Sequence, residues 1–258
     1  MATSEPLVVE REGAVRILRM NRPEALNAAD GHLHRRLADV WEELAEEADC
    51  RAVILTGTGR AFSAGGDLGV LERMHREPAY RQHMLDEGRR IVRGMVEFAW
   101  PVIAAVNGPA VGLGCSLAGL SDLVLIEAGA YLADPHVSIG LVAGDGGALT
   151  WPLLTGLLRA KEYLFTGERI PAEVAVELGL ANRVVPDGSA VDEAWALAAR
   201  LVAQPETALR FTKQAVNRHL ARSVHDALDL ALLGEHLSSA SPEHGAALAA
   251  MARRRDEK

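Results

Sequence analysis

The segment "DPHVSIGLVAGDGG" (134–147) contains a histidine and an aspartate that could share one proton-transfer task. His136 precedes Asp145 by nine positions (145 − 136) in a run that is otherwise mostly small or aliphatic. A carboxylate that orients an imidazole and stabilises its cation equips it as a general acid or base. The alternative is structural, with a hydrogen-bonded core histidine and with Asp145 capping the next helix. Spacing alone slightly favours the structural interpretation.

Two glycine-containing turns could supply the other half of such a site. They are "GRAFSAGGDL" (59–68) and "NGPAVGLGCSL" (107–117), each after an apolar run. Backbone N–H groups that are free at a helix start can converge into an oxyanion hole, which stabilises an enolate or a tetrahedral oxyanion. Spacing alone favours plain tight turns that need glycine for a positive φ. Neither turn matches a nucleotide-binding G-x-G-x-x-G or P-loop pattern.

The elements around these turns alternate between strand and helix patterns. The first residues predict a hairpin centred on Gly13, and apolar residues at helical spacing predict a helix at about 30–47 with Asp30 as its N-cap. A second helix is predicted at roughly 78–98. Runs typical of strands buried on both faces of a parallel sheet are "RAVILTG", "PVIAAV" and "DLVLIEA". This alternation predicts an α/β protein built from βαβ units.

After about residue 150 the patterns become helical, with the strand-like "ANRVV" as an exception. Five amphipathic runs predict helices: "RAKEYLFTG", "AEVAVELG", "VDEAWALAARLVA", "TALRFTKQAVNRHL" and "HDALDLALLGEHLSSA". No linker rich in Pro, Gly or Ser separates them from the preceding part. We therefore expect a helical extension that packs on the core or on a neighbouring subunit.

Composition and charge argue against several classes of partner. The chain has 258 residues, 49 % of them hydrophobic, and a net charge of −8 without a basic face, so nucleic acid is not an expected partner. Cys50 and Cys115 form no metal-ligand spacing, so we expect reduced thiols and no metal site. The acidic N-terminus is unlike a signal peptide, and Asn107-Gly108-Pro109 interrupts the longest uncharged run. These features predict a cytoplasmic protein with no membrane partner.

Five motifs resemble, in order and spacing, the enoyl-CoA hydratase/isomerase (crotonase) superfamily. They are "MNRPEALNA", "AFSAGGDL", "WPVIAAVNGPAVGLGCSLAGLSD", "GLVAGDGG" and "TGERIPAEVAVELGLANRVV". The resemblance runs from about residue 7 to the C-terminus. It implies an α/β crotonase (ClpP-like) fold, with a core of repeated ββα units at 1–195. It also implies a C-terminal helical region at 196–258 that builds homotrimers, often paired into hexamers.

The resemblance assigns roles to individual residues. It implies that the backbone N–H groups of Gly66 and Leu113 form the oxyanion hole. It implies a small acyl-CoA or ketone substrate, with coenzyme A as part of the substrate and no separate cofactor. Residues expected to contact the substrate or its CoA moiety are Ala64, Asp67, Leu68, Gly112 and Trp151.

Two departures from the family pattern change the expected chemistry. Hydratases use two glutamates to activate water and to protonate the α-carbon, and these positions fall on Ser116 and His136 here. A serine cannot replace a carboxylate as a base. His136 with Asp145 at this separation instead resembles the crotonase-fold β-diketone hydrolases represented by 6-oxocamphor hydrolase. In that mechanism the histidine activates water against a ketone, and cleavage of a C–C bond releases an enolate.

Three hypotheses follow. The first is an acyl-CoA-processing enzyme in which His136, oriented by Asp145, moves protons against an oxyanion at Gly66 and Leu113, with Ser116 bonding substrate or water. The second is a cofactor-free hydrolase that cleaves a C–C bond in a β-diketone. The third is a catalytically silent binding protein on the same fold.

Other candidate residues have a simpler structural explanation. Cys115 lies beside the hole without an adjacent base, so we expect it to be small buried packing. Asp67 is expected to organise its own turn. His32, His34 and His83 are expected on helix surfaces.

Overall fold

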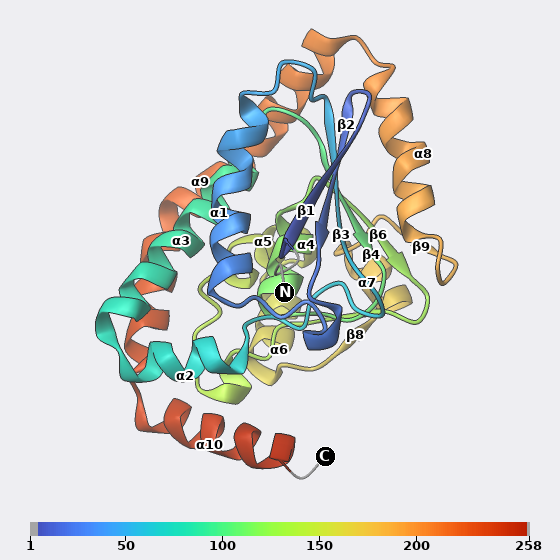
Figure 1. The fold of residues 1–258 in the computed structure, drawn as a ribbon. Helices are drawn as coiled ribbons and strands as arrows, with labels where there is room; N and C mark the ends of the chain where they lie inside the picture. The colour runs from blue at the N-terminus through green and yellow to red at the C-terminus, as the bar shows by residue number, and fades with distance from the viewer. Residues whose placement is uncertain (1–4, 257–258) are drawn as a thin grey trace.

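The fold is built on a six-stranded sheet, shown in Figure 1. Its strands are β1 (Leu7–Glu12), β2 (Val15–Met20), β3 (Ala52–Gly57), β4 (Val102–Val106), β6 (Leu123–Glu127) and β9 (Arg183–Val185). The computed structural model describes residues 5–256. β1 and β2 form the expected antiparallel hairpin, and the remaining neighbouring pairs, in the order β2-β3-β4-β6-β9, are parallel. The predicted parallel α/β sheet is therefore confirmed.

A second, smaller sheet lies at the carboxyl side of the first. It has the order β5-β7-β8 and consists of β5 (Ala110–Val111), β7 (Tyr131–Ala133) and β8 (Ile170–Pro171). β5 and β7 are parallel, and β8 joins β7 antiparallel. This sheet fixes two of the candidate site segments. β5 lies within the second glycine turn, directly before Gly112, and β7 ends directly before "DPH".

Ten α-helices and two short 3₁₀ helices surround the sheets in the described part of the chain. They are η1 (Pro23–Ala25), α1 (Gly31–Ala45), α2 (Leu68–Arg76), α3 (Pro78–Glu97), α4 (Leu113–Leu120), η2 (Val137–Ile139), α5 (Gly147–Thr155), α6 (Leu157–Thr166), α7 (Ala172–Leu178), α8 (Ala190–Val202), α9 (Glu206–Ser239) and α10 (Pro242–Asp256). Asp30 caps α1 as predicted, because its side chain accepts from the backbone N–H groups of His32 and Leu33.

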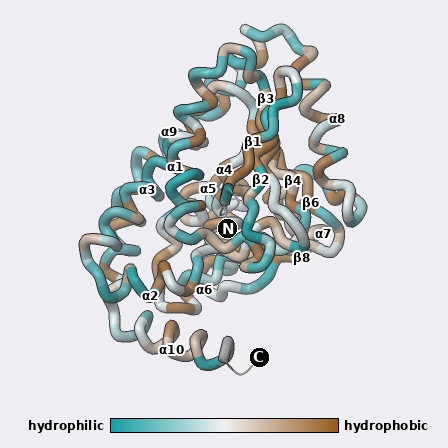
Figure 2. Tube along the Cα trace, viewed as in Figure 1, coloured by the Kyte–Doolittle hydropathy of each residue, from teal (hydrophilic) through white to brown (hydrophobic). Residues whose placement is uncertain are grey.

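The six-stranded sheet separates two apolar cores. On one side α8 presents Ala190, Ala194 and Ala198 to the sheet, and these small side chains allow the helix to lie close to it. On the other side α1, α3 and α9 pack together over a larger core (Figure 1). Figure 2 shows the central strands as largely hydrophobic, whereas the outer helices carry hydrophilic stretches. A strand buried on both faces explains why β3 is buried at every position.

The C-terminal helices differ from the expected pattern in three ways. The two runs predicted as separate helices form the single 34-residue helix α9, since no glycine or proline interrupts the chain between them. α8 runs across the expected boundary between 195 and 196 and packs on the sheet. α10, which no pattern singled out, packs against α2 and η2 at one end of the molecule (Figure 1).

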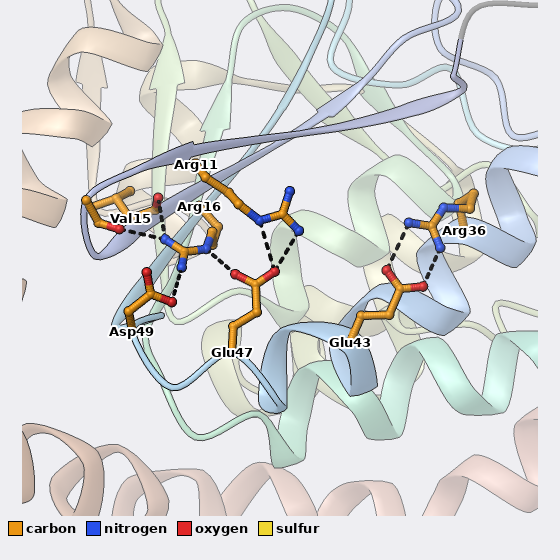
Figure 3. Close-up of polar contacts among 8 residues, drawn as sticks. Arg11, Val15, Arg16, Arg36, Glu43, Glu47 and Asp49 are labelled. Carbon is orange, nitrogen blue, oxygen red and sulfur yellow. Dashed lines mark hydrogen bonds and ion pairs between the residues drawn. The ribbon is translucent and has the colours of Figure 1, made fainter.

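An arginine cluster fastens the N-terminal hairpin to the end of α1 (Figure 3). Arg16 is buried, and its guanidinium pairs with Glu47 and with Asp49, the latter at 2.5 Å from Nη2 to Oδ1. It also donates to the Gly13 carbonyl oxygen at 2.7 Å. Arg11 approaches the same Glu47 from the exposed side at 2.7 Å.

Replacing Arg16 with methionine is expected to lower the free energy of unfolding by roughly 2–3 kcal/mol. The substitution leaves the Gly13 carbonyl and part of the Glu47 carboxylate without their charged donor. Arg11→Met is the matched control, because Arg11 is 57 % exposed and an exposed pair contributes about 0–1 kcal/mol. Urea unfolding monitored by circular dichroism measures both. Equal losses in the two variants would contradict the prediction.

Within residues 5–256, the structure contains no helix that combines the length and the apolar character needed to cross a bilayer.

Candidate active site

The two glycine turns lie against each other and are joined through their backbones. Ser63 in the first turn donates its N–H to the Pro109 carbonyl (3.1 Å) and accepts from the Val111 N–H (2.9 Å). Gly65 adopts φ +92°, and a Cβ built on it would lie 2.8 Å from the Val111 oxygen. Glycine is therefore required at this position both by conformation and by space. The contact brings the two helix starts, α2 and α4, to one place.

Gly66 and Leu113 line the same cavity, one from each turn. Leu113 is the first residue of α4, where a backbone N–H has no acceptor within the helix. Among residues 5–256, neither the Gly66 nor the Leu113 N–H has an intramolecular hydrogen-bond acceptor. Two free amides on one cavity are the donors that an oxyanion hole requires.

The cavity has a volume of about 70 Å³ and is mostly apolar. Its apolar walls come mainly from α2, α3 and α9, with Val70, Leu71, Met74, Met84, Leu85, Leu141 and Leu232. The side chains that can carry charge in this lining are His34, His136, Asp145 and Glu235. A mostly apolar pocket with a few convergent polar groups is typical of a small-molecule site.

His136 is oriented by Asp134, which corrects the expectation that Asp145 does so. Its Nδ1 makes a short hydrogen bond to Asp134 Oδ1, and both side chains are buried. Its Nε2 lies 3.8 Å from Asp145 Oδ2. This distance is short enough for attraction between opposite charges but too long for a hydrogen bond. Because the carboxylate can only accept, Nδ1 carries the proton. The other ring nitrogen, Nε2, lies on the side of Asp145, which lines the cavity.

Asp145 is held by Ser116 and does not cap the next helix. The Ser116 hydroxyl donates to Asp145 Oδ1 at 2.7 Å, and the N-cap of α5 is Gly146 without a side-chain bond. Ser116 is 1 % exposed and is not part of the cavity lining. Its expected contact with substrate or water is therefore corrected to a contact that positions Asp145.

Glu235 is a further acid in the cavity, which the sequence did not indicate. It projects from α9, is buried, and lines the cavity together with His136 and Asp145. Its Oε2 is buried without a hydrogen-bond partner among the described residues. Burial and the neighbouring Asp145 charge raise the pKa of Glu235 to about 8, so this carboxyl is mainly protonated at neutral pH.

The glycines of "GDGG" make room for these acids. A Cβ on Gly144 would lie 2.3 Å from Glu235 Oε2, and one on Gly147 would lie 2.1 Å from Asp134 Oδ2. A Cβ on Gly146 would lie 2.6 Å from the Ser116 Cβ. The loop thus contains glycine because its backbone passes directly against the polar side chains of the site.

The charges of the site favour a cationic histidine. Burial alone would lower the pKa of His136, but the Asp134 and Asp145 carboxylates outweigh burial and raise that pKa to about 10. At neutral pH the site therefore holds an imidazolium between two carboxylates. This arrangement can donate a proton from Nε2 to an anion that forms in the cavity.

Asp134→Asn is expected to lower the pKa of His136 toward its ordinary value of 6.5, because Asp134 is its nearest anionic partner. Histidine ¹⁵N NMR across a pH series measures this pKa directly. If the His136 imidazolium is the active form, the alkaline limb of the activity profile moves to lower pH by the same amount. Asp145→Asn is the control and shifts the pKa less. An unchanged pKa in Asp134→Asn would contradict this account.

The other expected site residues are not part of the cavity wall. Trp151 is 1 % exposed in the core and does not line the cavity. The residues Ala64, Asp67, Leu68 and Gly112 are neighbours of the hole amides in the chain but do not line the cavity. Asp67 accepts from the Gly69 N–H at 2.9 Å and so organises its own turn, as expected.

Cys115 fits the structural expectation. Its side chain is buried at 1 % exposure, and burial, aided by the Asp134 charge, raises the pKa of the thiol well above its ordinary value. A thiol in this state is not a nucleophile at neutral pH. Among residues 5–256, no group of three or more His, Cys, Asp or Glu side chains could hold a metal ion.

Three polar residues were missed or misplaced by sequence reasoning. Asp134 precedes His136 by two positions, and an acid at a strand end next to a histidine is a signal that could have found it. Glu235 carries no local signal, because an acid on an amphipathic helix is ordinarily solvated. His34, expected on a helix surface, is 9 % exposed and lines the cavity.

A parallel sheet with helices on both faces, and one cavity lined by two free amides and several ionisable side chains, is the architecture of an α/β enzyme. The family model for enoyl-CoA hydratase/isomerase matches residues 10–250. The short-chain-enoyl-CoA hydratase of Clostridium acetobutylicum is 33 % identical, over 86 % of this chain and 85 % of that protein. The chain therefore belongs to the enoyl-CoA hydratase/isomerase family and has the crotonase fold.

Two solved structures are informative neighbours. An enoyl-CoA hydratase/isomerase from Mycobacterium paratuberculosis is 48 % identical with a TM-score of 0.93, covering 96 % of this chain and 99 % of that one. A β-diketone hydrolase from the cyanobacterium Anabaena, bound to (S)-3-oxocyclohexyl acetic acid, is 31 % identical with a TM-score of 0.85, covering 92 % and 94 %. Both chemistries considered from the sequence thus occur among similar structures.

Proposed function

We propose that this enzyme acts on a small acyl-CoA thioester through an enolate, with His136 and Asp145 in place of the usual glutamate pair. The observation that carries the proposal is the single cavity that is lined by His136, Asp145 and Glu235 and by Gly66 and Leu113, whose amides are free. The family membership supports a CoA-linked substrate with no separate cofactor.

The proposed mechanism begins with the thioester carbonyl oxygen, which accepts hydrogen bonds from the Gly66 and Leu113 N–H groups. Negative charge that develops on this oxygen is stabilised more strongly than the neutral carbonyl, and this difference lowers the barrier. The His136 imidazolium, held by Asp134, donates a proton from Nε2 to the enolate carbon. The Asp145 carboxylate, which Ser116 positions, accepts the proton that the substrate or water gives up.

The proposal is tested with a panel of enoyl-CoA esters of increasing chain length, with mass detection of added water and chromatography for isomers. We expect at least one ester to be hydrated or isomerised. Calorimetry with crotonyl-CoA is the binding control, and the absence of any heat would reject a CoA thioester as the substrate. Binding of thioesters without turnover would instead support a silent binding protein.

A cofactor-free C–C hydrolase is the second candidate, because the Anabaena β-diketone hydrolase is a close structural neighbour and the hydratase glutamates are absent. In this reaction a water oxygen bonds to a ketone carbon, the adjacent C–C bond breaks, and its electron pair remains as an enolate at the hole. Protonation of the enolate completes the reaction. Gain of one water by a cyclic β-diketone, with no reaction of any thioester, would favour this candidate.

We also propose that the enzyme is a homotrimer or a dimer of trimers. Large apolar side chains are exposed on α5, α6 and α9, and α5 packs against both of the other helices. They include Leu153, Leu157, Leu158, Phe165, Leu230, Leu233 and Leu237. Apolar surface of this extent on a monomer is typical of an interface.

Leu158→Glu is expected to break this assembly, because Leu158 is 85 % exposed on α6 and a buried unpaired carboxylate is costly. Light scattering coupled to size-exclusion chromatography should change from three or six chains per particle to one. Arg159→Glu, at an exposed position of the same helix, is the control and keeps the oligomer. A monomeric wild-type protein would contradict the proposal.

A further inference from the structure

A second imidazole–carboxylate pair lies in the wall of the same cavity. His34 on α1 and Glu87 on α3 are joined by a hydrogen bond of 2.8 Å between Nδ1 and Oε2. Their side chains are 11 % and 5 % exposed, so the pair is almost entirely removed from solvent. It comes from elements that contribute nothing to the His136 cluster, which is built from the chain between β7 and α5 and from α9.

The state of Glu87 decides which nitrogen of His34 is free. Burial raises the pKa of Glu87, but hydrogen bonds from His34 and Arg35 outweigh burial and hold the pKa below its ordinary value. An ionised carboxylate only accepts, so Nδ1 of His34 carries the proton that it donates to Glu87. The Nε2 atom of His34 is then left for another partner.

Among the described residues, the hydrogen bond of the His34 ring is the one from Nδ1 to Glu87, and Nε2 makes none. His34 lines the cavity, where its neighbours in the wall include the apolar side chains of Val70, Met84 and Leu85. A ligand that displaces water from a polar atom in an apolar wall loses binding free energy unless the ligand itself supplies the hydrogen bond. A purely hydrocarbon substrate would leave this atom unpaired.

We propose that His34 Nε2 binds a second oxygen of the substrate, a hydroxyl or keto group on the acyl chain or ring, in addition to the carbonyl held at the oxyanion hole. This assignment rests on the proposed function, since it takes the cavity as the substrate site. Glu87 is the positioning residue that fixes the imidazole. A hydroxyl can donate to or accept from Nε2, and a keto oxygen accepts from the protonated ring.

The chain contains a matched control for this pair. His83 approaches the other oxygen of Glu87, with Nε2 at 3.0 Å from Oε1, but its side chain is 48 % exposed and it does not line the cavity. A purely structural role for the cluster would be disturbed by changes at His83 and His34 alike. A role in binding is disturbed only at His34.

The experiment is calorimetry with matched ligand pairs. Saturated acyl-CoA thioesters, which cannot be hydrated, are compared with and without one hydroxyl or keto group on the chain, and cyclic monoketones are compared with diketones of the same ring. We expect the oxygenated member of a pair to bind wild-type protein about tenfold more tightly. His34→Leu reduces this ratio to about one, His34→Gln retains part of it, and His83→Leu leaves it unchanged.

A second readout separates binding from folding. In protein with ¹⁵N-labelled histidine, the Nε2 resonance of His34 moves when the oxygenated ligand is added and not when its hydrocarbon counterpart is added. Equal binding of both members by wild-type protein, or an unchanged ratio in His34→Leu, overturns the inference while the proposed function stands. Failure of every thioester and ketone to bind overturns both.

Discussion

Replacing His136 with alanine is expected to lower kcat at least ~10²-fold, the lower end for loss of a general acid or base. His136 lines the cavity of the proposed oxyanion hole, and its pKa of about 10 keeps it cationic at neutral pH beside two carboxylates. Alanine removes the donor and leaves Asp134 and Asp145 facing each other without a cation between them. Steady-state kinetics on the substrate identified by the panel measures the loss.

Two controls give the His136→Ala result its meaning. Unfolding temperature and circular dichroism establish that the variant folds, because Asp134 loses a buried partner and some stability with it. His32→Ala, an exposed histidine on α1 outside the cavity, is expected to retain full activity. Turnover of His136→Ala within a fewfold of wild type would remove His136 from the mechanism.

Replacing Leu113 with proline is expected to lower kcat by about 10²–10³-fold, which is the typical cost of losing one oxyanion donor. Proline has no backbone N–H, so the substitution deletes this donor specifically. Leu113 is the first residue of α4, a position where proline is tolerated in helices. Gly112 before it adopts φ +51°, a conformation that glycine accommodates readily.

Leu113→Ala is the matched control, because it shortens the side chain that lines the cavity but keeps the N–H. We expect this variant to change KM more than kcat, while Leu113→Pro lowers kcat itself. Equal kcat in the alanine and proline variants would show that the Leu113 amide does not stabilise the transition state.

Much of the fold could be predicted because its signals are local. The buried strands appear as uninterrupted apolar runs, and Asp30 caps α1 through bonds to residues two and three positions away. The length of α9 was not predicted, since two amphipathic runs look alike whether one helix or two contain them. The packing of α8 on the sheet depends on three alanines whose partners are distant strands.

The site was only partly predictable. Residue types and their spacing along the sequence identified His136, Asp145 and the two glycine turns as candidates. They did not identify the hydrogen-bond partner of each group. His136 is hydrogen-bonded to Asp134 and not to Asp145, and Asp145 accepts from Ser116 and does not cap a helix. Such pairings depend on directions of side chains at a sheet edge, which a one-dimensional spacing does not contain.

The sequence by itself determined the parallel α/β core, the family and the absence of the glutamate pair, because local hydrophobic patterns and ordered motifs carry that information. Only the tertiary structure decided that Glu235 and His34, which are 99 and 102 positions from His136 (235 − 136 and 136 − 34), share its cavity. The physical reason is that burial and charge act through space. A carboxyl on α9 acquires a pKa of about 8, and an imidazole on α1 faces the cavity, only after the helices have packed over the sheet.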